Sequence, residues 1–171
     1  MKINVLELKH SREANYIFKK EFDGFEIGQD KVQFVKPVQL KVQVNVAGEE
    51  ILVRGKITAV FKLICNRCLE PYNTEIYVNF MENLIKEDKY KKLPVDEKDD
   101  NLHSYKGDII ELDELVKQNI ILSLPIKRIC SVNCKGLCPQ CGKNLNTEKC
   151  DCKIDNVDPR LAKLKDFFKF N

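Results

Sequence analysis

Residues 38–63, VQLKVQVNVAGEEILVRGKITAVFKL, alternate apolar and polar side chains in two runs that are separated by a turn at Gly48. Such alternation is typical of half-buried strands, because successive side chains of a strand point to opposite faces. A third run, residues 72–80, repeats the pattern after a short connection. Parallel neighbours would need a crossover of about a dozen residues, so the short connections predict an antiparallel meander.

Weaker patterns flank these three runs. Residues 3–8 and 22–35 are further strand candidates, which we assign to the same sheet. Residues 109–124 carry apolar side chains at mostly three- and four-residue spacing and end at Pro125, which predicts a helix laid on the sheet. The sequence therefore predicts an α+β fold, with an antiparallel meander or partly closed sheet and a packed helix.

Two domains are expected in the 171 residues. Residues 1–126 form the β-rich domain, in which residues 86–107 mix Lys with Asp and Glu and hold too few apolar side chains to offset ordering, so they predict a mobile loop. Residues 127–171 form a cysteine-rich, zinc-binding tail. This tail ends in a predicted helix, for which Asp158 is the N-cap and Pro159 the first helical residue.

Eight cysteines are present, and five of them lie in residues 134–152. A chain of this length can bury a core without cross-links. It shows neither a signal-peptide pattern nor an apolar stretch of the roughly 20 residues that span a bilayer, so we expect a soluble, cytoplasmic protein without a membrane partner. In a reducing cytosol, clustered cysteines are more often metal ligands or catalytic thiols than disulfides.

The tail holds the first predicted zinc site. Cys138-Pro139-Gln140-Cys141-Gly142 has the form of a zinc knuckle, in which the glycine permits the positive φ that such a turn usually needs. In Cys150-Asp151-Cys152, an extended backbone would direct both sulfurs to the same side. These two motifs predict one quartet of ligands, made of Cys138, Cys141, Cys150 and Cys152.

The other four cysteines form the second predicted quartet, Cys65, Cys68, Cys130 and Cys134, which would tie the tail to the sheet. We therefore expect two Zn²⁺ ions with four cysteines each. The pairing stays open, because Cys130, Cys134 and Cys138 are spaced four apart, so that Cys134 can exchange places with a neighbour. The six tail cysteines alone can also hold a two-metal cluster with bridging sulfurs.

Iron–sulfur, disulfide and redox uses of the cysteines are alternatives to zinc. The Cys65-x-x-Cys68 pair resembles a thioredoxin-type motif, but that motif should open a helix in a βαβ unit. Here it lies between two predicted strands. The position therefore favours metal binding.

The charge distribution gives limited guidance on partners. The net charge is +3, but thiolate ligation adds negative charge, so the bulk charge does not argue for nucleic acid. From residue 127 onward, ten Lys and Arg stand against five Asp and Glu, so an anion-binding surface is expected on the tail. The candidate phosphate contacts are Arg67, Lys127, Arg128, Lys135, Lys143, Lys149 and Arg160.

No catalytic set emerges from the sequence. All-cysteine quartets are closed structural sites, whereas catalytic zinc keeps an open position. The only histidines, His10 and His103, lie in unrelated weak-pattern segments, and no glycine-rich phosphate loop is present. We expect a protein that is not an enzyme and has no small-molecule substrate.

Three strings carry a family resemblance: CNRCLEP at 65–71, CKGLCPQCGKNLN at 134–146 with its trailing CDC, and DPRLAKLKDF at 158–167. In this order they resemble the YceD family, the large ribosomal RNA subunit accumulation proteins, from about residue 44 to 168. The resemblance implies a cytoplasmic role in ribosome biogenesis, in accumulation or processing of the large-subunit rRNA. Because some family members lack most tail cysteines, it also implies that zinc is scaffolding, and it supplies no catalytic residue.

Our leading hypothesis is a non-enzymatic factor that binds large-subunit rRNA, a ribosomal protein, or both. One alternative is a protein-only module, in which a zinc-pinned surface and the 109–124 helix dock a ribosomal protein. A thiol oxidoreductase that uses Cys65 and Cys68 is the other alternative.

Overall fold

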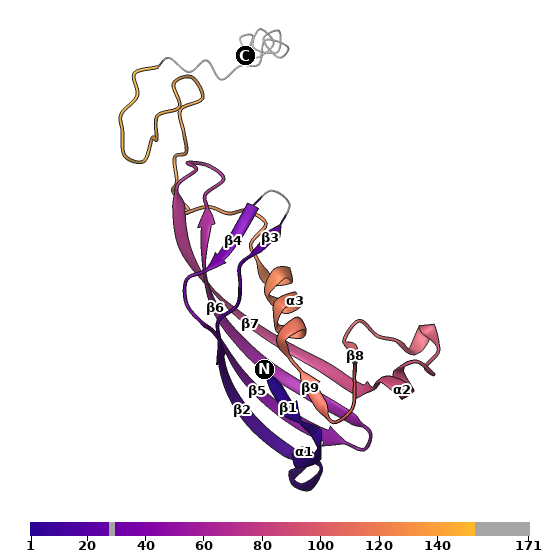
Figure 1. Cartoon of the computed structure of the whole chain (residues 1–171). Coiled ribbons are helices and arrows are strands. Elements are labelled where there is room, and N and C mark those ends of the chain that lie inside the picture. Colours follow the sequence, from indigo (N-terminus) through magenta and orange to yellow (C-terminus); the bar gives the residue numbers. More distant parts are fainter. Residues whose placement is uncertain (28–29, 153–171) are drawn as a thin grey trace, which may run out of the picture. The chain divides into compact units, whose positions relative to one another are not determined.

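The computed structural model describes residues 1–27 and 30–152. It divides the chain into two compact units (Figure 1). Unit 1 comprises residues 1–63 and 71–128, and unit 2 comprises residues 64–70 together with the chain from residue 129. The segment with Cys65 and Cys68 thus belongs to the same unit as the tail cysteines. The predicted domain boundary after residue 126 stays a prediction.

The regular elements of the described residues all precede residue 124. They are β1 (Lys2–Asn4), α1 (Val5–Ser11), β2 (Glu13–Lys20), β3 (Phe25–Ile27), β4 (Asp30–Phe34), β5 (Val38–Ala47), β6 (Glu50–Ile64), β7 (Pro71–Lys86), α2 (Glu87–Tyr90), the 3₁₀ turn η1 (Val95–Glu97), β8 (Leu102–Tyr105), β9 (Ile109–Glu111) and α3 (Asp113–Ser123).

The main sheet has seven strands and is built around β6, which pairs with β5, β4 and β7. The β5–β6 hairpin keeps an antiparallel register from Ala47↔Glu50 to Gln39↔Thr58. The predicted order of three neighbouring strands, β5, β6 and β7, is confirmed. A closed sheet is not supported, because β2 pairs only with β5 among the described strands and so forms an edge. The β7–β8 pair is parallel.

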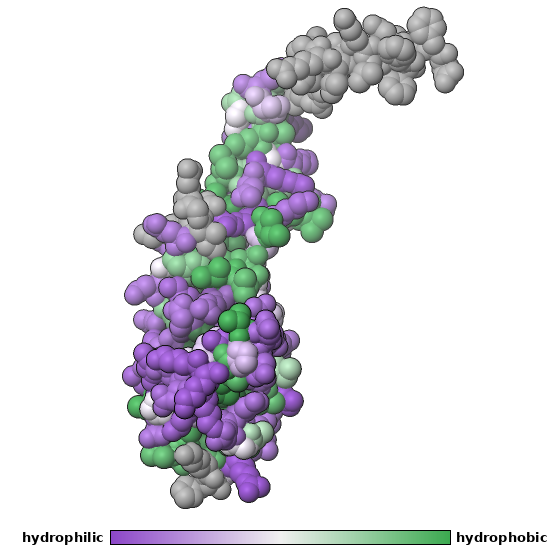
Figure 2. Space-filling model, turned by 90° about the vertical axis from the view of Figure 1, so that its right-hand side faces the viewer, coloured by the Kyte–Doolittle hydropathy of each residue, from purple (hydrophilic) through white to green (hydrophobic). Residues whose placement is uncertain are grey.

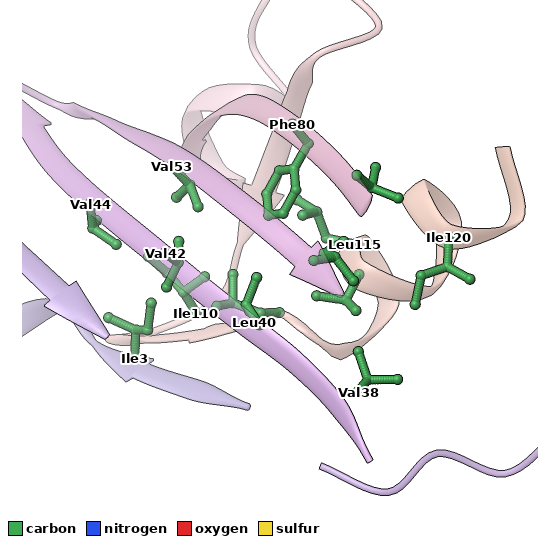
Figure 3. Close-up of a cluster of buried hydrophobic side chains, with 14 of the residues drawn as sticks. Ile3, Val38, Leu40, Val42, Val44, Val53, Phe80, Ile110, Leu115 and Ile120 are labelled. Atoms are coloured by element: carbon green, nitrogen blue, oxygen red, sulfur yellow. The ribbon is translucent and has the colours of Figure 1, made fainter. Parts of the chain in front are cut away.

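One face of the sheet is covered and carries the core of unit 1. Alternate residues of β5 and β6 are buried on this face, as the period of two requires. They pack against side chains from β1, α1, β9 and α3 (Figure 3). Gly55 of β6 leaves room for the Phe80 ring of β7, since a Cβ at Gly55 would lie 2.2 Å from that ring.

The predicted helix at 109–124 begins later than expected. Residues 109–111 form strand β9, which pairs with β1 in a separate two-stranded sheet, and α3 follows from Asp113. Helix α3 packs on the sheet as predicted, with Leu115, Val116 and Ile120 buried. The strand was missed because its partner lies more than 100 residues away, so local spacing carried no sign of it.

The predicted strand at 3–8 is wrong beyond residue 4. The Asn4 side chain accepts a hydrogen bond from Leu6 N at 3.0 Å, and this N-cap starts helix α1. Val5 and Leu8 are both buried, at the three-residue spacing of one helical face. β1 also lies outside the main sheet, contrary to the expectation.

Residues 22–35 do join the main sheet, as predicted, but as two strands, β3 and β4. Strand β2 at 13–20 was not expected. Its weak pattern follows from its place at the sheet edge, where Tyr16 and Phe18 are only half-buried and Ile17 is 71% exposed on the other face.

The segment 86–107, expected to be one loop, contains α2, η1 and strand β8. Strand β8 forms because residues 102–105 pair with the end of β7 and bury Tyr105. Figure 2 shows this side of unit 1, where hydrophilic side chains predominate, as the charged sequence requires. Mobility of the segment stays a prediction, and the predicted helix from Asp158 lies outside the described residues.

Candidate metal centre

The cysteines gather into two groups of four in unit 2. Within each group, all four sulfur atoms lie within 4.8 Å of one another. We call Cys65, Cys68, Cys130 and Cys134 tetrad A, and Cys138, Cys141, Cys150 and Cys152 tetrad B. These are the two quartets proposed from the sequence. Among the described residues, Cys134 does not exchange places with a neighbour, and the six tail cysteines do not form one cluster.

Tetrad A joins two distant segments of the chain. The Sγ atoms of Cys65 and Cys134 are 3.8 Å apart, and those of Cys68 and Cys130 are 3.7 Å apart. Burial opposes ionisation of Cys65, but backbone N–H groups of Cys68, Arg67 and Cys130 donate to its sulfur and lower its pKa to about 6. The hydrogen bond with Cys134 raises the pKa of Cys130 to about 12.

Tetrad B is local in sequence and more open to solvent. The Sγ of Cys150 lies 3.4 Å from that of Cys138 and 3.5 Å from that of Cys141. Backbone N–H groups of Cys141 and Gln140 lower the pKa of Cys138 to about 6. The hydrogen bond with Cys150 raises the pKa of Cys152 to about 12. In each tetrad the knuckle backbone thus prepares one thiolate, as a cation site needs.

The sulfur separations match what a tetrahedral metal requires. A Zn–S bond of about 2.3 Å implies an edge of about 3.8 Å between neighbouring sulfurs of a tetrahedron. The four separations between sulfur atoms given above run from 3.4 to 3.8 Å, far longer than the roughly 2.05 Å of a disulfide bond. Four sulfur donors in this arrangement fit zinc or iron–sulfur chemistry. Both tetrads can therefore hold a metal ion.

The two knuckles share one backbone pattern. In tetrad A, Leu69 N donates to Cys65 O at 2.9 Å and Cys65 N donates to Glu70 O at 3.0 Å. In tetrad B, Gly142 N donates to Cys138 O at 2.9 Å, and Cys138 N donates to Lys143 O at 2.8 Å. Leu69 and Gly142 both have positive φ, +59° and +73°. The sequence analysis did not compare the two knuckle backbones, and at the position of Gly142 the first knuckle has a leucine.

Residues around tetrad A also hold its segments together. Arg67 Nη1 donates to Cys134 O at 3.0 Å, and Arg67 O accepts from Leu137 N at 3.0 Å. Asn146 Nδ2 donates to the Cys134 sulfur at 3.4 Å, while its Oδ1 accepts from Lys135 N at 2.8 Å. Sequence reasoning missed Asn146. Two signals were present: its place in the loop between the two halves of tetrad B, and its position at the end of the family string at 134–146.

The predicted phosphate contacts are divided between the units. Lys127 and Arg128 belong to unit 1, whereas Arg67, Lys135, Lys143 and Lys149 belong to unit 2. The Lys143 ammonium lies 4.0 Å from a Glu148 carboxylate oxygen. Arg67 already donates within its own unit. Arg160 lies outside the described residues.

The two histidines were expected at the surface. His103 is 34% exposed in its side chain, and its Nε2 lies 3.3 Å from Oε2 of Glu82. The other Glu82 oxygen accepts from Asn119 of α3 at 3.3 Å. His103 therefore belongs to a contact of β8, β7 and α3 and not to a tetrad. Nothing is described of the His10 side chain. Across the residues described, no helix is both long and apolar enough to cross a membrane.

Fold and site together define an α+β protein with a mostly antiparallel sheet and two four-cysteine sites suited to metal ions. A family model described as "Large ribosomal RNA subunit accumulation protein YceD" matches residues 53–168. The chain belongs to the YceD family.

Named relatives come from plants and bacteria. The chain is 32% identical over 160 residues to the chloroplastic "Large ribosomal RNA subunit accumulation protein YCED homolog 1" of Zea mays, with 78% of this chain and 54% of the maize protein covered. The Arabidopsis thaliana homolog is 29% identical over 153 residues, with 71% and 46% covered. YlbN of Bacillus subtilis, described as uncharacterized, is 26% identical over 174 residues, with 99% and 97% covered.

The chain spans about half the length of the plant relatives. No solved structure matches it.

Proposed function

We propose that this protein is a non-enzymatic, zinc-binding factor of ribosome biogenesis. It acts in the cytoplasm, and it supports accumulation or processing of large-subunit rRNA by binding the rRNA, a ribosomal protein, or both. The single observation behind the zinc assignment is the pair of closed, four-sulfur sites. The family description and the maize relative's name support the role in rRNA accumulation.

Each Zn²⁺ would serve as a structural cross-link with four thiolate ligands and no open position for a substrate. Tetrad A would fasten residues 64–70 to the tail, and tetrad B would close the loop of 138–152. Other residues of the chain would position the ligands. Backbone N–H groups hold the thiolates of Cys65 and Cys138, and Arg67 and Asn146 fix the segments that carry Cys134.

The test of the metal assignment is quantification of zinc and iron in protein purified under reducing conditions, together with native mass spectrometry. Two zinc ions per chain are expected. A folded protein without metal, or with iron in place of zinc, would contradict the assignment. On the same sample, pull-down from lysate with RNA sequencing and mass spectrometry identifies the partners.

Direct contact of the tail with RNA is tested by charge reversal. Lys149 is exposed and has no ion pair in the described part of the chain, and Lys143 has only its 4.0 Å neighbour Glu148. Lys143→Glu with Lys149→Glu should weaken the salt-dependent gel shift of large-subunit RNA fragments. A pull-down that captures a ribosomal protein, but captures no RNA once the ribosomal proteins have been removed from that RNA, would favour the protein-only module.

The pKa of Cys65, which backbone N–H groups lower to about 6, is the feature of this cysteine pair that favours a thiol oxidoreductase. Against it, the Cys65 side chain is 0% exposed, whereas a reactive thiolate must reach its partner. Alkylation of Cys65 before and after chelation separates the two uses. A structural ligand is protected until the metal is removed, and a redox thiol reacts at once.

A further inference from the structure

A groove crosses the uncovered face of the main sheet in unit 1, with a volume of about 640 Å³. Its floor is the backbone of one row of paired residues, Tyr16↔Val42↔Gly55, on strands β2, β5 and β6. The Val42 side chain points to the covered face (Figure 3), so the neighbours on either side of it point into the open. The groove therefore runs across the strands on the face opposite α3.

Two rows of side chains form the walls. One row is Asn15, Gln43 and Arg54, and the other is Ile17, Lys41 and Lys56, each in register across the same three strands. Asn79 and Met81 extend the groove onto β7, which lies beside β6 (Figure 1). Four strands are three spacings of roughly 4.8 Å, so the groove is about 14 Å long.

The charged side chains that line the groove are all basic. Lys41, Arg54 and Lys56 take part in no ion pair with any residue the structure describes, and the groove lining holds no carboxylate. One acid lies next to the Gln43 wall: Glu13 Oε1 accepts from Gln43 Nε2 at 2.7 Å.

Lys41 and Lys56 also lie directly opposite each other in the β5–β6 register. Like charges in this arrangement destabilise a sheet. A bound anion would neutralise the repulsion between the two lysines, so the destabilising pair would favour anion binding.

The apolar residues of the groove indicate which kind of anion would bind. Ile17 and Met81 are 71% and 57% exposed, which leaves apolar surface beside the cations. Proteins hold single-stranded nucleic acid in a cationic groove that follows the phosphate backbone, and bases stack on adjacent aromatic side chains. Ile17 and Met81 are not aromatic, so here the bases would gain apolar contact without ring stacking. A length of about 14 Å corresponds to about four phosphates of one stacked strand, close to the number of cations. An acidic peptide added as a strand would lie along a sheet edge, whereas this groove runs across the strands.

We propose that this groove binds the phosphate backbone of a single-stranded RNA segment through Lys41, Arg54 and Lys56. The inference rests on the proposed function in its RNA-binding form and gives unit 1 a contact surface of its own. It is separate from the lysines of the tail.

The test is fluorescence anisotropy with a labelled single-stranded RNA oligonucleotide and the full, metal-loaded chain. Three phosphate contacts predict a salt slope near −2, which is about 20-fold weaker binding at 200 mM than at 50 mM salt. The variant Lys41→Gln, Arg54→Gln, Lys56→Gln should lose that share of the slope. The matched control, Lys36→Gln, Lys92→Gln, Lys117→Gln, removes the same charge from exposed sites outside the groove, and its slope should change little.

The outcomes separate the two proposals. Equal RNA binding by the groove variant and its control overturns the groove proposal. If Lys143→Glu with Lys149→Glu then abolishes RNA binding, the RNA contact lies on the tail. Absence of RNA binding by the wild-type chain overturns the groove and the RNA arm of the proposed function together. Displacement of the RNA by oligoglutamate at equal concentration overturns the nucleic-acid assignment. If the variant is misfolded by circular dichroism, photo-crosslinking of 4-thiouridine RNA to the wild-type chain decides, and adducts outside residues 15–17, 41–43, 54–56 and 79–81 contradict the groove.

Discussion

The two units are stabilised by different means. Unit 1 has a continuous hydrophobic core with side chains from β1, α1, β4 to β9 and α3. In the described part of unit 2, by contrast, the buried side chains are all cysteines, namely Cys65, Cys68, Cys134 and Cys138. Unit 1 can therefore fold by burial of apolar surface. The described part of unit 2 buries little such surface, so we expect its stability to depend on whatever joins its sulfurs.

The largest expected effect follows directly from this difference. Removal of metal by a strong chelator under reducing conditions should unfold unit 2 and leave unit 1 folded, since a structural zinc site contributes about 10–16 kcal/mol of apparent folding free energy. Amide hydrogen exchange measures this local unfolding of unit 2. The amides of Leu69 and Gly142, hydrogen-bonded in the two knuckles, should lose protection, while those of the β5–β6 hairpin keep theirs.

Reloading with zinc is the control for this experiment and should restore protection of both amides. Retained protection in the chelated protein would show that unit 2 does not depend on metal, and the contrast between the units would fail.

The next effect concerns the opposite unit. Ile120 of α3 is 0% exposed, and Ile120→Ala should lower the unfolding free energy of unit 1 by about 2–5 kcal/mol through lost burial and the cavity left behind. Leu122→Ala on the same helix is the matched control, because Leu122 is 84% exposed. Chemical denaturation gives both values. Neither variant should change the metal content, and loss of metal from Ile120→Ala would contradict independent stabilisation.

The sequence predicted those parts of unit 1 in which local pattern and burial agree. The β5–β6 hairpin is an example, since both of its strands alternate over their full length and are connected by a short turn. β9 and β8 could not be predicted, because each is a strand only through a partner elsewhere in the chain, β1 and β7 respectively. The Asn4 cap shows a different limit. A local signal was present there, and the apolar run of residues 3–8 was taken for a strand instead.

The cysteine groups were more predictable than their surroundings. Knuckle spacing and the extended Cys150-Asp151-Cys152 motif were enough to propose tetrad B, and the remainder gave tetrad A. The outer contacts were not predictable. The bond from Asn146 to Cys134 depends on the path of a loop, and the open-face groove depends on the register that places Lys41 opposite Lys56.

A smaller effect distinguishes two glycines of unit 2. Gly136 and Gly142 have nearly the same φ, +76° and +73°, but a Cβ at Gly136 would lie 3.0 Å from Arg67 O, while one at Gly142 would meet nothing within 4 Å. Gly142→Ala should therefore cost only the left-handed conformation, roughly 1 kcal/mol. Gly136→Ala adds overpacking and should cost about 2–4 kcal/mol.

Competition with a chelator of known affinity measures both glycine variants as a change in metal binding. The extra loss in Gly136→Ala should fall on tetrad A, since Arg67 bonds the Cys134 carbonyl. Cadmium substitution, with one NMR signal per site, shows which tetrad is weakened. Equal losses in the two variants would mean that contact with Arg67 does not support tetrad A.

The smallest predicted effect sharpens the comparison of the two knuckles. Leu69 has φ +59° and is 63% exposed, so it bears the left-handed strain without burying its side chain. Leu69→Asn should relieve part of this strain, because asparagine tolerates the left-handed region, and should stabilise metal binding at tetrad A by about 0.5 kcal/mol. The measurement is the rate of metal release to a chelator, which should fall slightly. A faster release would mean that the leucine side chain itself stabilises the knuckle, and that tetrad A differs from tetrad B in more than the glycine it lacks.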